Sequence, residues 1–197
     1  MPLPPAENRE LLHTRYITCK GYKRQDGLWD VEGELVDLKS FDLKVIERND
    51  GIIPTGEPLH KMALRLTVDY DLLIHDVQAC MDYTPFRHCP SIADNFRRLI
   101  GHRIAPGFTR LTRELLGGTQ GCTHLLEMLG TMATTAYQTT HQEREKREDF
   151  GIGGETPPPT LNTCHSFDTS GPVVQRYWPQ FYTGDDTTED EGDTPQD

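Results

Sequence analysis

The strongest structural signal in this sequence is a strict alternation of apolar and polar residues near the middle of the chain. Met62, Leu64, Leu66 and Val68 recur at every second position, which is the period of a β-strand with one buried face. After a short turn, a second β-rich run follows over residues 72–79. Two strands joined by a short turn pair antiparallel, so this region predicts a hairpin with one face in the core.

A second hairpin is predicted closer to the N-terminus. Asp26-Gly27 lies between two β-rich runs, residues 16–22 and 28–36. An Asp-Gly pair between such runs is the strongest short signal for a hairpin turn. We therefore expect two hairpins.

Helical spacing replaces the strand pattern after residue 88. Pro90 fits the first position of a helix that ends near Gly101, since proline is common at helix starts and glycine at helix ends. A short helix is expected around Leu111, and a longer one from Cys122 to the charged stretch 141–149. The predicted fold class is α+β, with an antiparallel sheet of two hairpins and three helices packed on one face.

Length and composition bound the domain organisation. A chain of 197 residues with 35% hydrophobic content can bury one ordinary core. We expect a single α+β domain over 1–150, a Gly- and Pro-rich linker over 151–160, and a C-terminal segment, 161–183, that docks on the domain. A disordered acidic tail is expected over 184–197.

The charge excludes some classes of partner. The net charge is −11, but the tail holds seven acidic residues and no base, so the remainder is only mildly acidic. That balance gives no basic footprint for nucleic acid.

No run approaches the roughly 18 apolar residues of a membrane span, and the N-terminus lacks the pattern of a secretory signal. Five scattered cysteines do not suit a disulfide framework. We expect a cytoplasmic protein with a small-molecule substrate, and the first strands could form a homodimer contact.

Three residues are predicted to bind a metal ion. Cys89 and Cys122 lie where predicted helices begin, and the unpaired N–H groups and positive dipole of a helix N-terminus favour the thiolate. His60 lies where an irregular loop enters a strand. Thiolates with imidazole suit zinc or iron, so these three are the predicted ligands.

Proton transfer is assigned to a second set of residues. His124 and Glu127 are three positions apart on one predicted helix face, so the carboxylate could orient the imidazole or take part in proton transfer. His165, beside Cys164, is a further candidate. The alternative interpretation is structural: free cysteines are often small core residues, and such a protein would only interact with partners.

The order of these features resembles that of the iron-sulfur scaffold proteins of the NifU N-terminal, or IscU, type. The resemblance runs over about residues 56–138 and is carried by the segments GEPLH, CPSIA and GCTHLLEM. It implies an IscU-like fold, with His60, Cys89 and Cys122 in the positions of the family's three ligands. Met62 stands where that family has a regulatory aspartate, which favours a fixed metal ion over a labile cluster.

Nearly the whole chain is also similar to a bacterial family known only as a domain of unknown function. The segments LHTRYITCKGYKRQDGLWDVEGELVD and GEPLHKMALRLTVD carry this similarity. Members of that family are often found among genes for the breakdown of aromatic compounds. The resemblance implies a catabolic enzyme that acts on aromatic compounds. A fixed site with histidine suits acid-base or Lewis-acid work, so we expect a small-molecule enzyme of lyase or hydrolase type. The alternative is an iron-sulfur or sulfur carrier without catalytic activity.

Overall fold

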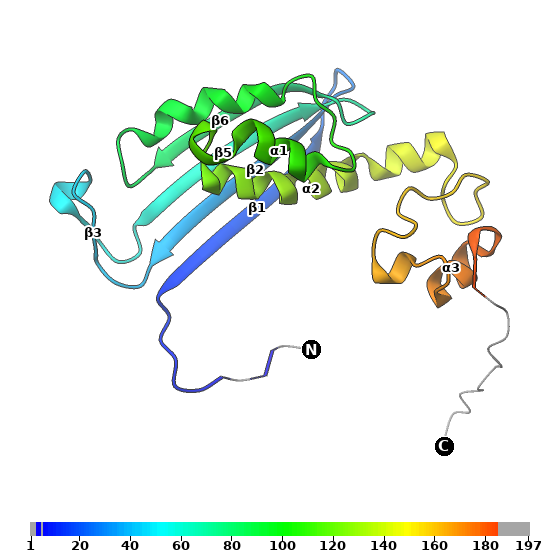
Figure 1. The fold of residues 1–197 in the computed structure, drawn as a ribbon, viewed down its shortest axis with the longest axis horizontal. Helices are drawn as coiled ribbons and strands as arrows, with labels where there is room; N and C mark the ends of the chain where they lie inside the picture. The colour runs from blue at the N-terminus through cyan, green and yellow to red at the C-terminus, as the bar shows by residue number, and fades with distance from the viewer. Residues whose placement is uncertain (1–2, 5, 185–197) are drawn as a thin grey trace. The chain divides into compact units, whose positions relative to one another are not determined.

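The computed structural model describes residues 3–4 and 6–184 (Figure 1). Apart from Gly184, the predicted acidic tail lies outside the described residues. Contacts within the chain divide it into two compact units, residues 1–140 and 141–197. The predicted docking of the C-terminal segment on the N-terminal domain stays a prediction.

The first unit is built on a four-stranded antiparallel sheet with the strand order β1-β2-β5-β6 (Figure 1). The strands are β1 (His13–Lys23), β2 (Trp29–Lys39), β5 (Pro58–Val68) and β6 (Ile74–Tyr83). Strands β1 and β2 form the first predicted hairpin, and β5 and β6 form the second. Two short strands, β3 (Leu43–Lys44) and β4 (Ile52–Ile53), pair in the connection between the hairpins. The sequence therefore predicted the sheet correctly.

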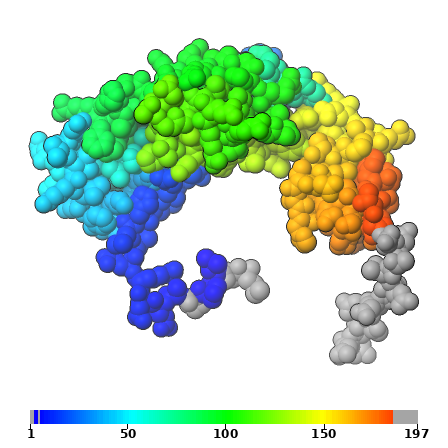
Figure 2. Space-filling model, in the orientation of Figure 1, coloured from blue at the N-terminus to red at the C-terminus, as the bar shows by residue number. Residues whose placement is uncertain are grey.

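Helices cover one face of this sheet, as Figure 1 shows. They are the 3-10 helix η2 (Cys89–Leu99) and the α-helices α1 (Phe108–Leu116) and α2 (Thr123–Glu148). Short 3-10 turns, η1 (Asn49–Gly51) and η3 (Gly118–Gln120), lie in connections. In the space-filling view, α1 and the first part of α2 form a continuous green to yellow-green surface (Figure 2). None of the described helices has the length and apolar character needed to cross a bilayer.

The core lies between the sheet and these helices. The alternating side chains of β5 are all buried, with Leu66 and Val68 fully inaccessible. On β2, Leu35 belongs to the same buried layer. At Gly33 of β2 the helix comes close, because a Cβ there would lie 2.7 Å from Sδ of Met132 in α2. Glycine at this strand position lets α2 pack against the sheet.

The second unit has a small aromatic core of its own. It contains η4 (His165–Phe167), α3 (Pro172–Tyr177) and η5 (Pro179–Phe181). The Trp178 indole N–H donates to the backbone carbonyl of Gly151 at 3.1 Å, and its ring lies 5.7 Å from the ring of Phe167. Val174 is fully buried.

Candidate functional site

A polar cluster interrupts the apolar layer at one end of the helix-covered face. The strand register places Arg15 of β1 opposite Asp37 of β2, and Asp37 opposite His60 of β5. Along the strands, Asp37 follows buried Leu35, and His60 precedes buried Met62. Side chains two positions apart point to the same face. Three neighbouring strands therefore present an arginine, an aspartate and a histidine side by side toward the helices.

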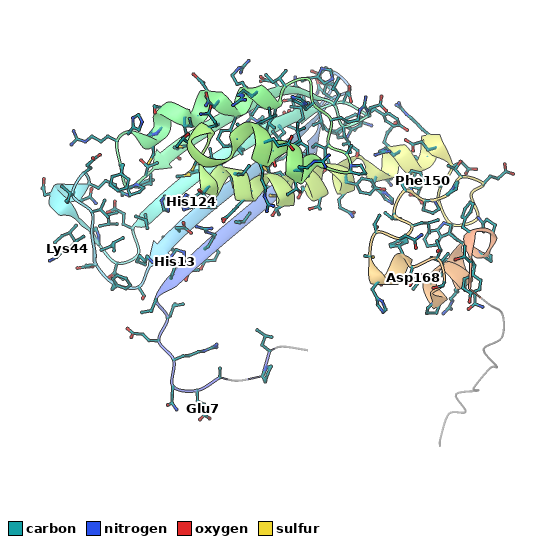
Figure 3. All side chains as sticks on the ribbon, viewed as in Figure 1. Glu7, His13, Lys44, His124, Phe150 and Asp168 are labelled. Atoms are coloured by element: carbon teal, nitrogen blue, oxygen red, sulfur yellow. The ribbon has the colours of Figure 1, made fainter. Side chains whose placement is uncertain are left out.

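The first turn of α2 contributes a second imidazole. The His124 ring centroid lies 3.9 Å from that of His60, with an angle of 35° between the planes. Its Nε2 atom is 3.7 Å from Oδ2 of Asp37. Figure 3 labels His124 together with His13, the first residue of β1, at this end of the sheet.

Asp37 is the centre of the cluster and is only 1% exposed. Arg15 donates to both carboxylate oxygens, from Nε to Oδ1 at 2.7 Å and from Nη2 to Oδ2 at 2.9 Å. The Nδ1 atom of His60 lies 2.9 Å from Oδ2, and Nε2 of His13 lies 3.2 Å from Oδ1. A buried carboxylate is costly unless such partners replace water.

These partners keep Asp37 charged. Burial by itself would raise the pKa of Asp37, but the hydrogen bonds from Arg15 and His60 outweigh it, and the pKa falls from 3.8 to about 2. The pKa of Arg15 is raised, chiefly by its hydrogen bond to Asp37. The cluster therefore contains a fixed negative charge at neutral pH.

The two imidazoles are held toward their neutral form. Burial lowers the pKa of His60, the neighbouring His124 lowers it further, and Asp37 offsets this only in part. Burial likewise lowers the pKa of His124, with a further contribution from the charge of Arg15. A neutral imidazole is the form that binds a metal ion.

Arg15 also joins the sheet to α2. Its Nη1 atom lies 2.6 Å from Oε2 of Glu127, while the rest of the guanidinium holds Asp37. Each of the three guanidinium nitrogens of Arg15 thus donates one hydrogen bond within the cluster, which makes it a positioning group for Asp37.

Asp37, His60 and His124 could hold a metal ion, because each offers a ligand atom and these atoms lie within 4.8 Å of one another. Zinc bonds of about 2.0–2.1 Å in a tetrahedron place ligand atoms about 3.3 Å apart. The two distances from Oδ2 of Asp37, 2.9 Å to His60 and 3.7 Å to His124, bracket that spacing. The two imidazole nitrogens also lie within 4.8 Å of each other.

The structure does not bring the predicted ligands His60, Cys89 and Cys122 together in this group. Cys89 begins η2, which packs against β6, the sheet edge opposite β1. The neighbours of His60 lie instead on the β2 side, where Asp37 is its cross-strand partner. Asp37 and His124 are the potential ligands that lie beside His60 in this group, and metal binding by Cys89 and Cys122 stays a prediction.

Cys122 lies next to the cluster, directly before α2. Its Sγ atom is 3.8 Å from Nδ1 of His124 and 3.9 Å from Sδ of Met62. Of the predicted proton-transfer residues, His124 and Glu127 both belong to the cluster, and their catalytic roles stay predictions. His165 begins η4 in the second unit, and its role also stays a prediction.

The sequence reasoning missed Asp37 and Arg15, although the sequence contains a signal for Asp37. In β2 the alternation of Trp29, Val31 and Leu35 assigns the next inward position to residue 37. A carboxylate at a position that the alternation assigns to the core needs buried partners. This signal points to a polar site at that end of the strand.

The opposite, helix-free face of the sheet has a groove of about 380 Å³. Two of its charged side chains, Arg65 and Glu32, pair with each other at 2.5 Å. No residue of the polar cluster lines this groove. It is therefore separate from the candidate site.

Together these features define an α+β protein with a buried Asp-His-His group that could hold a metal ion. The profile of the family described as "Protein of unknown function (DUF2889)" matches residues 13–138, about two thirds of the chain, and the chain belongs to this family. Comparison with curated proteins and with solved structures gives no significant match. The match covers every residue of the cluster, from His13 to Glu127. The predicted membership of a family of unknown function is confirmed.

Proposed function

We propose that this protein is a metal-dependent enzyme that acts on a small organic molecule, with Asp37, His60 and His124 as the metal ligands. One observation carries the proposal: two imidazole nitrogens approach the same oxygen of a carboxylate that is 1% exposed. Catalytic zinc sites use three protein ligands and keep a position open, whereas structural sites use four. A set of one carboxylate and two imidazoles matches the catalytic pattern.

The donor atoms suit zinc or ferrous iron, since both are bound by imidazole and carboxylate. Such an ion supplies Lewis-acid chemistry or a water of lowered pKa, which fits the predicted hydrolase or lyase activity. The structure also indicates which nitrogen of each histidine would bind the ion. Nδ1 of His60 and Nε2 of His124 are the nitrogens that face Asp37, so they are the proposed ligand atoms.

The other members of the cluster support this arrangement. Arg15 fixes both oxygens of Asp37, in the way that groups outside a metal's own ligands commonly orient them. Glu127 balances the charge of Arg15 at 2.6 Å. The proposed roles of Glu127 and His124 in proton transfer rest on this proximity to the ligands.

The second candidate function is the iron-sulfur or sulfur carrier on an IscU-like scaffold. The order of hairpin, His60, Cys89 and Cys122 favours it. Iron-sulfur clusters are held mainly by thiolates, and the potential ligand group around His60 contains no cysteine. Anaerobic reconstitution with iron and sulfide separates the two functions, because a carrier should acquire visible charge-transfer absorption and the proposed enzyme should stay colourless.

The cytoplasmic location, a homodimer and an aromatic substrate complete the proposal. They rest on the sequence and on the resemblances drawn from it.

The test of the proposed function is metal analysis of the full chain purified without an affinity tag. We expect about one equivalent of zinc or iron per chain, or the uptake of about one equivalent of added zinc. The variant His60→Gln should lose this binding. The matched control is His75→Gln, because His75 is an exposed β6 residue that pairs with Asp69, and it should bind metal normally.

Two outcomes would overturn the proposal. One is a metal content below about a tenth of an equivalent together with no uptake of added zinc. The other is equal metal binding by His60→Gln and His75→Gln. Circular dichroism of each variant checks that a loss of binding does not reflect unfolding.

A further inference from the structure

A groove of about 360 Å³ lies between α1 and α2, on the helix layer beside the candidate metal site. Its walls are formed by residues of α1 (Thr109, Thr112, Arg113) and of α2 (Thr123, Leu126, Glu127). Its volume lies within the range of about 300–1,000 Å³ that is usual for small-molecule sites. The groove is large enough for one small organic molecule.

Gly130 lines the groove and has no role in packing that the structure reveals. It lies inside the 26-residue helix α2, where glycine is less favourable than any residue except proline. A Cβ at Gly130 would meet nothing within 4 Å, whereas at Gly33 it would lie 2.7 Å from Sδ of Met132. A glycine kept in a helix interior without a close neighbour leaves open space at the groove.

The groove holds one guanidinium, that of Arg113, and one carboxylate, that of Glu127. Arg113 has no ion pair within the part of the chain that the structure describes. The carboxylate of Glu127 is already paired with Arg15 at 2.6 Å. A guanidinium binds a carboxylate through two parallel hydrogen bonds, while Leu126 offers an apolar surface to the rest of a ligand.

The groove adjoins the metal ligands through two residues. Thr123 directly precedes His124 in α2. Glu127 lines the groove and contacts Arg15, which in turn holds Asp37. The groove therefore shares Glu127 with the polar cluster, while Asp37, His60 and His124 do not line it.

We infer that this groove binds a small organic carboxylate, with Arg113 holding the carboxylate and the space at Gly130 receiving the apolar part. Its role as the substrate site rests on the proposed function, but the binding itself does not require a metal ion. This assigns the substrate class of the enzyme as organic acids with an apolar body.

The test uses benzoate as the probe and benzamide, its uncharged analogue, as the control ligand. Binding to the full chain is followed by shifts of backbone amide signals in nuclear magnetic resonance, without metal and then with zinc. We expect benzoate to shift the signals of Thr109, Thr123 and Gly130, and to bind at least about tenfold more tightly than benzamide because of the charge-assisted contact.

Three variants sharpen the result. Arg113→Gln should weaken benzoate binding at least about tenfold through loss of the charged partner. Gly130→Leu should abolish binding by filling the groove while improving helix propensity, so unfolding would not explain its effect. Arg110→Gln is the matched control on the same helix, because Arg110 pairs with Glu114 and lies outside the groove, and it should bind benzoate normally.

The inference is overturned if benzamide binds as tightly as benzoate. It is also overturned if Arg110→Gln and Arg113→Gln lose binding equally, if Gly130→Leu binds normally, or if benzoate shifts no groove signal. A chain that binds zinc but not benzoate contradicts only this inference. A chain that binds benzoate but not zinc contradicts only the metal-dependent function.

Discussion

Two neighbouring cross-strand pairs of the same sheet differ sharply in character. Leu35 of β2 lies opposite Met62 of β5, and two residues further along the strands Asp37 lies opposite His60. All four side chains are buried on the helix-covered face. The first pair continues the apolar core, whereas the second begins the polar cluster.

The difference separates an apolar part of the sheet, which stabilises the fold, from a polar part, for which we propose a metal site. Apolar burial stabilises the fold in proportion to the area removed from water. A buried ion pair is often no better for stability than apolar residues of similar volume. The position of Asp37 is therefore not explained by stability alone, and the proposed metal site would give it a reason.

The largest expected effect concerns stability at the apolar pair. Leu35→Ala should lower the free energy of unfolding by about 2–5 kcal/mol, because it leaves a cavity at a fully buried position. Urea denaturation measures this loss. Zinc affinity of the folded protein should remain unchanged, and a large loss of zinc affinity in this variant would erase the distinction between the two pairs.

At the polar pair, the expected effect is on the metal ion. Asp37→Asn should weaken zinc binding about 100-fold or more, because it removes a charged ligand. Competition with a chromophoric chelator measures the affinity. Asp30→Asn is the control, since Asp30 lies on the same strand but accepts a hydrogen bond from Thr67. Equal zinc affinity in the two variants would exclude Asp37 as a ligand.

The pH dependence of stability should also separate the pairs. The pKa of both His60 and His124 is lowered from 6.5, so the unfolded chain takes up protons first and metal-free protein should lose stability as pH falls below 6.5. The pKa of Asp37 is about 2 instead of 3.8. Its ionised form should therefore contribute about 2 kcal/mol above pH 4, and this contribution is lost as pH falls toward 2.

Urea midpoints of the metal-free chain between pH 8 and pH 3 measure this dependence. Replacing His60 with Gln should reduce the decrease that begins below pH 6.5. Leu35→Ala, which carries no titrating group, should show the wild-type pH profile at lower overall stability. A flat wild-type profile between pH 7 and pH 5 would contradict the assigned protonation of the two histidines.

The smallest expected effect concerns the positioning of Asp37. Arg15→Lys keeps the charge but cannot donate to both carboxylate oxygens in the same way, so zinc affinity should fall about tenfold. The control is Arg65→Lys, because Arg65 pairs with Glu32 on the opposite face of the sheet. An unchanged affinity in Arg15→Lys would show that its two hydrogen bonds to Asp37 do not orient the ligand.

The two cross-strand pairs also differ in how far the sequence could predict them. Local signals predicted both hairpins and the α2 helix. The spacing of apolar residues such as Met62 and Leu64 predicted the second hairpin and the helix, and the Asp26-Gly27 turn predicted the first hairpin. His60 and His124 were chosen for their chemistry, and they lie together in the structure. Their common partner Asp37 is 23 residues from His60, and only the pairing of β2 with β5 brings them together.

The metal-ligand role of Cys89 stays a prediction. Its place at the start of a helix was predicted, and η2 begins there. The helix packs on β6, on the side of the sheet away from β1. A residue's position within its own element does not determine which strand that element covers, so sequence spacing could not decide which residues lie near His60.

The most direct test of the central claim is the zinc X-ray absorption spectrum of the zinc-loaded full chain. The proposed ligands predict only nitrogen and oxygen neighbours at about 2.0–2.2 Å from the ion. A sulfur neighbour at about 2.3 Å would show that a cysteine binds the metal. That result would contradict a centre formed by Asp37, His60 and His124.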